Sequence, residues 1–284
     1  MASLKDLRRR IRATKSMQQI FKAMEMVAAA KLRRAQQRAQ ASSPYAQKIT
    51  HMLANLAGAA AELDHPLFKE REVKHTALVV ITADRGFAGA YNTNVLRHAE
   101  LRLRTAPKDS IQIVAVGRKG RDYLRRRGYP ILAAHTDLPG EASLEFARGL
   151  TSDLTERFMK GEVDRIEVMY SHFVNVVVRD VRTEVFLPVA GQVGAAAQDR
   201  GIIFEPDAET LFAELLTRYA TAKLYSALAD ALASEHSARM VAMGSARKNA
   251  GELVDSLTLT RNRLRQAAIT REIAELVGGA EALK

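Results

Sequence analysis

The chain has 284 residues, enough for one or two domains with a packed core, and its formal net charge at pH 7 is +11. The absence of cysteine excludes disulfides, thiol catalysis and cysteine-based metal sites, and no apolar run approaches the roughly 20 residues that span a bilayer. The positive charge implies an acidic partner, which is nucleic acid, anionic lipid or an acidic protein surface.

The N-terminal segment, residues 1–57, predicts a single long helix. Ser3 is placed to cap it, with Asp6 three residues later as an acidic partner. Pro44 should bend or divide the helix, and Gly58 should help to end it. Apolar residues recur at steps of three and four, which is the spacing of one helical face. That predicted face consists of Leu4, Leu7, Ile11, Met17, Ile20, Met24, Val27, Leu32 and Ala35.

The middle segment, residues 58–206, predicts an α/β domain. Short runs rich in β-branched residues alternate with helical patterns, which favours a mainly parallel sheet covered on both faces. The runs around Val174 and Val185 are close enough in sequence to form an antiparallel hairpin at the edge of the sheet. The predicted strands are 75–81, 111–116, 164–170 and 174–178, and the predicted helices are 94–103, 118–127 and 141–159.

The C-terminal segment, residues 207–284, predicts a second long helix, free of proline through residue 277 and stopped by Gly278 and Gly279. Its predicted seam has coiled-coil spacing. Helices of this size reach roughly 75–100 Å and exceed the middle domain, so the two ends should wind into an antiparallel coiled coil. The seam consists of Leu253, Leu257, Thr260, Leu264, Ala267, Arg271 and Ala274.

Several motifs follow one another along nearly the whole chain. Near the C-terminus, Ile269-Thr270 is followed by Glu272, by Glu275 and by Gly279-Ala280. Further matching stretches are residues 21–36 (FKAMEMVAAAKLRRAQ), 238–272, and the loop 82–92 (TADRGFAGAYN). In this order they resemble the gamma-subunit family of F-type, proton-translocating ATP synthases.

The resemblance implies a fold and a role. The fold is a long antiparallel coiled coil of the terminal helices with a central Rossmann-like α/β domain. The role is that of a non-catalytic rotor shaft without cofactor or metal, present once per complex, which couples proton-driven rotation to conformational changes in the catalytic beta subunits. The implied partners are a ring of three alpha and three beta subunits, the epsilon subunit and the membrane c-ring. The implied place is the cytoplasmic face of a bacterial plasma membrane, bound peripherally and not to nucleic acid.

The resemblance also implies where the shaft meets its ring. An apolar tip could turn inside an apolar collar without breaking directional bonds, and a basic face could pass acidic loops through weak ion pairs. The implied ring contacts are Met24, Arg239, Arg265, Gln266, Thr270, Ile273 and Leu276, and the implied basic face is Arg8, Arg9, Arg12, Arg33 and Arg34.

Two other classes of function stay open from the residues alone. A basic coiled coil could bind nucleic acid, although no aromatic residues interleave with the arginines for base stacking. A doubly wound enzyme could bind a ligand near Asp84, where residues 82–89 follow a strand. That loop lacks the ending of a phosphate-binding P-loop and the glycine order of a dinucleotide site, so a structural turn is the favoured interpretation. The seven histidines are scattered and predict no metal site.

Overall fold

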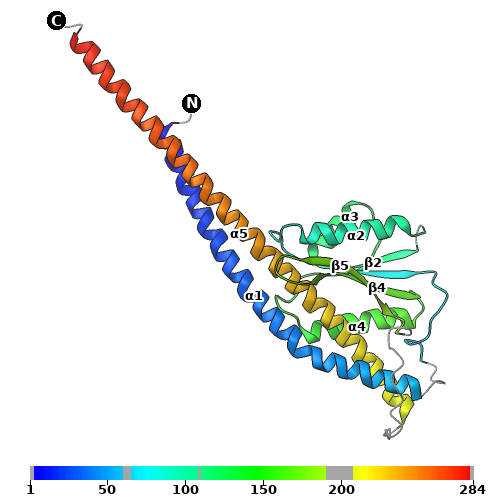
Figure 1. Ribbon diagram of the computed structural model, residues 1–284. Helices are drawn as coiled ribbons and strands as arrows, with labels where there is room; N and C mark the ends of the chain where they lie inside the picture. Colours follow the sequence, from blue (N-terminus) through cyan, green and yellow to red (C-terminus); the bar gives the residue numbers. More distant parts are fainter. Residues whose placement is uncertain (1–2, 60–64, 108–109, 190–206, 282–284) are drawn as a thin grey trace. The chain divides into compact units, whose positions relative to one another are not determined.

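The computed structural model describes residues 3–59, 65–107, 110–189 and 207–281 (Figure 1). Two long helices, α1 (Leu4–Ala59) and α5 (Ala208–Glu281), stand at the two ends of the chain. The chain divides into two compact units. The first is Met1–Val27 with Met240–Lys284, and the second is Ala28–Arg239, which contains the α/β domain and the inner parts of both helices.

The second unit is built around a five-stranded sheet with the order β3-β2-β1-β4-β5. The first four strands are parallel, and β5 pairs antiparallel with β4 at the edge. The predicted mainly parallel sheet is therefore confirmed. An antiparallel hairpin lies at its edge as predicted, but the run around Val185 pairs with β4 and not with the run around Val174. The strands are β1 (Thr76–Ile81), β2 (Ile111–Val116), β3 (Ile131–His135), β4 (Arg165–Phe173) and β5 (Arg179–Leu187).

Helices cover both faces of this sheet, as predicted. Helices α2 (Tyr91–Thr105) and α3 (Arg118–Arg126) lie on one face, and α4 (Leu144–Met159) lies on the other (Figure 1). Strand β1 is fully buried and supplies both cores, because its side chains alternate between faces. Val79 and Ile81 join the core shared with α1, α4 and α5, whereas Leu78 and Val80 pack with α2 and α3.

Two strand predictions differ from the structure. Strand β3 was not predicted, because its five residues are mostly half-exposed and carry no strong apolar run. Residues 174–178 were predicted as a strand but form the turn between β4 and β5. The Asn175 side chain explains this turn, because its Oδ1 accepts hydrogen bonds from the backbone N–H of Val177 at 2.9 Å and of Val178 at 2.8 Å.

The predicted helix ends also need correction. Helix α1 continues through Pro44, which does not divide it, because buried residues on either side, such as Leu32 and Leu53, hold both halves. Helix α5 continues through Gly278 and Gly279 to Glu281, so the glycine pair is not a stop. The predicted N-cap of α1 is confirmed, since the Ser3 hydroxyl accepts from the Asp6 N–H at 3.1 Å.

Candidate functional site

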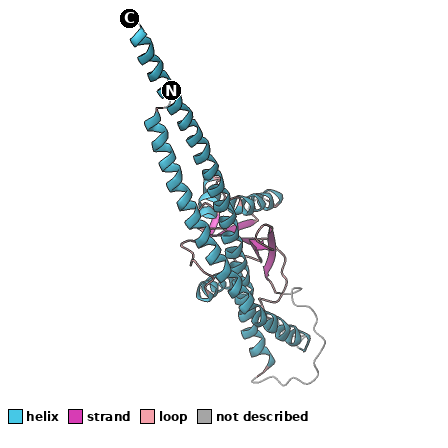
Figure 2. Cartoon of the chain, turned by 60° about the vertical axis from the view of Figure 1, so that its left-hand side comes forward, coloured by secondary structure: helices cyan, strands magenta, loops and turns pink. Residues whose placement is uncertain are grey.

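The first unit consists of the start of α1 lying beside the end of α5 (Figure 2). Leu7 and Ile11 of α1 are buried in this pair, as are Met243, Ala250 and Val254 of α5. Gly244 faces Glu25, and Gly251 faces Gln18. Residues later in α5 therefore face residues earlier in α1. The helices are therefore antiparallel, and the predicted winding of the two ends is confirmed within this unit.

Polar side chains from α1 fill holes over glycines of α5. A Cβ added to Gly251 would lie 2.8 Å from Nε2 of Gln18, and one added to Gly244 would lie 3.2 Å from Oε1 of Glu25. Glu25 and Gln18 are seven residues apart, and so are the two glycines, which is one heptad in each helix. This matched spacing fixes the register of the pair, and the sequence reading missed it because it followed apolar residues alone.

The seam of the pair is therefore displaced from the predicted faces. On α1, Met17, Ile20 and Val27 are exposed, although they were predicted to face inward. On α5, Val254 is buried, whereas its neighbour Leu253, which was predicted to lie in the seam, is exposed. At this point the observed seam lies one residue later than the predicted one. The physical reason is that the glycines accept Gln18 and Glu25 into the seam, which turns the nearby apolar residues outward.

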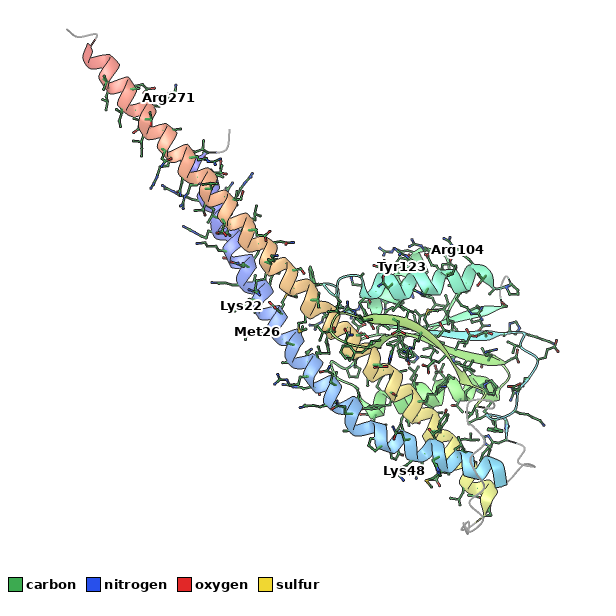
Figure 3. All side chains as sticks on the ribbon, in the orientation of Figure 1. Lys22, Met26, Lys48, Arg104, Tyr123 and Arg271 are labelled. Atoms are coloured by element: carbon green, nitrogen blue, oxygen red, sulfur yellow. The ribbon has the colours of Figure 1, made fainter. Side chains whose placement is uncertain are left out.

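The C-terminal turns of α5 extend past the first residues of α1 (Figures 1 and 2). Every described side chain from residue 269 to 278 is exposed. The apolar members of this stretch are Ile269, Ile273, Leu276 and Val277, with 48%, 55%, 74% and 58% of their surface accessible. We call these four residues the apolar tip. Arg271 marks the same stretch in Figure 3.

The implied ring contacts differ in their surroundings. Arg265, Gln266 and Thr270 are exposed on α5, and the Thr270 hydroxyl donates to the Gln266 carbonyl at 3.0 Å. Ile273 and Leu276 belong to the apolar tip, so these five residues share the last turns of one helix. Met24 is half-buried on α1.

Arg239 lies in the second unit and is held by its own chain. Its guanidinium lies 2.7 Å from Oε1 of Glu235 and donates to the Gly86 carbonyl at 3.2 Å. Both charged side chains are nearly buried, at 14% and 12% exposure. Burial raises the pKa of Glu235, and the charge of Arg239 only partly offsets that effect. Arg239 thus ties α5 to the loop after β1.

The five implied basic-face residues are all exposed, and they are divided between the two units. Arg8, Arg9 and Arg12 belong to the first unit, where Arg9 pairs with Asp6 at 3.1 Å. In the second unit, Arg33 is exposed and Arg34 pairs with Glu141 at 3.2 Å. Such exposed pairs are weak, at about 0–1 kcal/mol each.

At the carboxyl edge of the sheet, the Asp84 carboxylate accepts hydrogen bonds from two backbone N–H groups. Its Oδ1 accepts from the Arg118 N–H at 2.8 Å, and its Oδ2 accepts from the Leu138 N–H at 2.6 Å. This carboxylate therefore occupies the start of α3, where a phosphate would bind in a doubly wound enzyme. The backbone after β1 also packs closely on Gly117, since a Cβ added there would lie 2.2 Å from the Thr82 carbonyl oxygen.

The cavity beside Thr82, Tyr91 and Glu235 has a volume of only about 20 Å³. Within the described ranges, no three His, Asp or Glu side chains are arranged to hold a metal ion. Across the same residues, no helix has the length and apolar character needed to cross a membrane.

Comparisons with known proteins agree with this architecture. Residues 3–283 match the family described as ATP synthase. The chain is 46% identical to the ATP synthase gamma chain of Desulforamulus reducens and 46% identical to that of Moorella thermoacetica, in both cases over the full length of both proteins.

Solved structures show the same fold. One comes from the mitochondrial ATP synthase of Euglena gracilis and matches with a TM-score of 0.72 and 22% identity over 99% of this chain and 94% of that one. Another comes from the central stalk and c-ring of the Tetrahymena thermophila mitochondrial ATP synthase, with a TM-score of 0.64 and 25% identity over 80% of this chain and 99% of that one. The chain belongs to the ATP synthase family, as one of its gamma chains.

Proposed function

We propose that this chain is the central rotor shaft of an F-type ATP synthase and is not itself catalytic. In this proposal the paired helices turn inside a ring of three alpha and three beta subunits. Contacts that differ between the beta conformations transmit the rotation, because a conformational equilibrium shifts only as far as a partner binds its states differently. The three functional segments are residues 1–57, 58–206 and 207–284.

The apolar tip carries the proposal. Four large apolar side chains on the last turns of α5 have no cover among the described residues of this chain. An exposed apolar patch of this kind marks an interaction site. Burial in an apolar collar is non-directional, so it stabilises the tip at many angles and allows rotation.

The seam supports a role in which the helix pair must stay in register. Matched polar layers at Glu25 and Gln18 oppose sliding of one helix along the other, because a shift would leave both side chains facing non-glycine residues. A pair that keeps its register under load can transmit torque.

The α/β domain is proposed to bind the epsilon subunit and the membrane c-ring, with one copy of the chain in each complex. The complex would lie at the cytoplasmic face of a bacterial plasma membrane and hold this chain peripherally. A structural role for this domain is supported by Asp84, which fills the position that a phosphate ligand would need.

The experiment is assembly of the full chain with alpha and beta subunits, followed by measurement of ATP hydrolysis. The test variant carries Ile273→Asp and Leu276→Asp in the apolar tip. The control carries Leu101→Asp, a change at a leucine on α2 that is 62% exposed. We expect the tip variant to assemble poorly and the control to assemble normally. Equal assembly of both would contradict the proposal, as would purification of the wild type with nucleic acid in place of the ring.

A further inference from the structure

The outer helices of the α/β domain carry a concentrated positive charge. Residues 91–107 and 110–127, which contain α2 and α3, hold nine Lys or Arg against two Asp or Glu, a net charge of +7. The whole chain has +11, so this short stretch accounts for more than half of the excess. Figure 3 labels Arg104 and Tyr123 on these helices.

Four of the nine cations are neutralised within the chain. Arg102 pairs with Glu167, Arg118 with Asp137, Arg121 with Asp122, and Arg127 with Glu100. The side chains of the other five are exposed and make no hydrogen bond or ion pair with any described residue; they are Arg97, Arg104, Lys119, Arg125 and Arg126. We call these five residues the free basic face.

Side-chain contacts hold α2 and α3, which carry the free basic face, against each other. Arg127, at the end of α3, lies 2.5 Å from Glu100 of α2, and its guanidinium stacks 3.9 Å from the centre of the Tyr123 ring. Crossover helices run opposite to the parallel strands they join, so the C-terminal ends of α2 and α3 meet at the amino edge of the sheet. That end holds Arg104, Arg125 and Arg126.

Helix dipoles account for only part of this arrangement. Basic residues favour the last turn of a helix, which suits Arg104, Arg125 and Arg126. Lys119 lies in the first turn of α3, where the dipole disfavours a cation, and Arg97 lies in the middle of α2. A partner with negative charge spread over an area would attract all five.

The lack of an apolar anchor selects the kind of partner. A specific protein interface has a buried centre of aromatic or aliphatic side chains. On the described residues of α2 and α3, Leu101 is the one large apolar side chain that is mostly exposed. An anionic bilayer needs no such centre, because its surface potential attracts each nearby Lys or Arg regardless of shape. We propose that the free basic face docks on anionic lipid headgroups.

The test is flotation of the full-length chain with vesicles of phosphatidylcholine, with or without phosphatidylglycerol. The test variant carries Arg104→Gln, Arg125→Gln and Arg126→Gln. The control carries Arg8→Gln, Arg10→Gln and Arg12→Gln, which removes the same charge from exposed positions on α1. We expect the test variant to bind anionic vesicles about 100-fold more weakly than the wild type, and the control to remain close to the wild type.

Two further measurements keep the proposal open to refutation. The variant with lysine at the same three positions should keep most of the binding, since the attraction depends on charge. High salt should release the wild type. Equal loss in the test variant and the control would show that net charge alone acts and would overturn the proposal. Failure of the wild type to prefer anionic vesicles would also overturn it and leave an acidic protein as the partner.

Discussion

Glu25 of α1 accepts a hydrogen bond from Arg247 of α5, with 2.8 Å between Oε2 and Nε. The same carboxylate faces Gly244, one turn before Arg247 on α5. Because both partners are partly exposed, this ion pair contributes only about 0–1 kcal/mol to stability. The ion pair matters for the alignment of the two helices, because it joins residues 222 positions apart in the sequence and favours one register.

Gly251→Leu tests the glycine holes. A leucine there must displace Gln18, and such overpacking costs about 1–3 kcal/mol in the free energy of unfolding. Gly278→Leu is the control, because nothing lies within 4 Å of its added Cβ. Thermal unfolding should show a loss for the first variant and none for the second. If the two variants unfold alike, Gly251 does not set the helix spacing.

Asp84→Ala tests the closed edge of the sheet. The change removes a carboxylate that accepts two backbone hydrogen bonds at the ends of neighbouring strands. We expect it to lower the free energy of unfolding by about 2–4 kcal/mol. Hydrogen bonds to charged groups each contribute about 1.5–3 kcal/mol, and the exposed bond from Arg118 contributes less than that. Phosphate and nucleotides should not stabilise the wild type. A rise in its melting temperature with either ligand would favour a binding site here.

Arg239→Ala is expected to affect folding as well as coupling. As an implied ring contact, Arg239 would affect coupled synthesis alone. The structure places Arg239 against Glu235, and removing one partner of a buried pair costs about 3 kcal/mol or more. Denaturant unfolding of the isolated chain measures this loss. A variant as stable as the wild type would return Arg239 to the role of a pure surface contact.

Gln266→Leu should impair coupled ATP synthesis and leave folding unchanged. Gln266 is exposed on the same turns as the apolar tip, so its side chain is free to contact a partner. Arg148→Leu is the control, because it places a leucine at an exposed position on α4. Synthesis rates in reconstituted vesicles provide the measurement. A normal rate in the Gln266 variant would remove this residue from the implied contact surface.

His236 should make the chain less stable in acid. Burial, together with the charges of Arg239 and Lys31, lowers the pKa of this imidazole from 6.5 to about 4. Between these values the unfolded chain binds a proton that the folded chain does not, so stability falls as the pH drops from 6.5 to 4, by about 3 kcal/mol. Glu235 acts in the opposite sense, because its raised pKa gives stability that is lost as the pH rises through it.

The measurement for His236 is the difference in unfolding free energy between the wild type and His236→Gln at several pH values. Glu235 is common to both proteins, so the difference isolates the imidazole. We expect the wild type to lose more stability than the variant between pH 6.5 and 4. Parallel curves would show that the pKa of His236 is the same in the folded and the unfolded chain.

The sequence was sufficient where local pattern and tertiary packing agree. Strand β2 matches its prediction at both ends, because Ile111–Val116 is buried on both faces and is apolar at every position except Gln112. Helix α4 begins later than predicted, because Ser143 accepts a hydrogen bond from the Phe146 N–H and caps it there. The spacing of apolar residues does not show which of several polar residues caps a helix.

The candidate site was only partly predictable for a similar reason. Two residues of the apolar tip, Ile273 and Leu276, are exposed and are also among the implied ring contacts, whereas Ile269 and Val277 were not among them. The polar layers at Gln18 and Glu25 were missed, because a coiled-coil search rewards apolar residues in the seam. The informative signal was the heptad spacing that Gly244 and Gly251 share with those two side chains.

Rotation of the chain inside its ring is the most direct test. The wild type has no cysteine, so Arg148→Cys on α4 gives a single attachment point for an optical probe. With an immobilised ring of alpha and beta subunits, addition of ATP should turn the probe continuously in one direction. ATP hydrolysis at a normal rate while the probe stays stationary would contradict the rotor proposal.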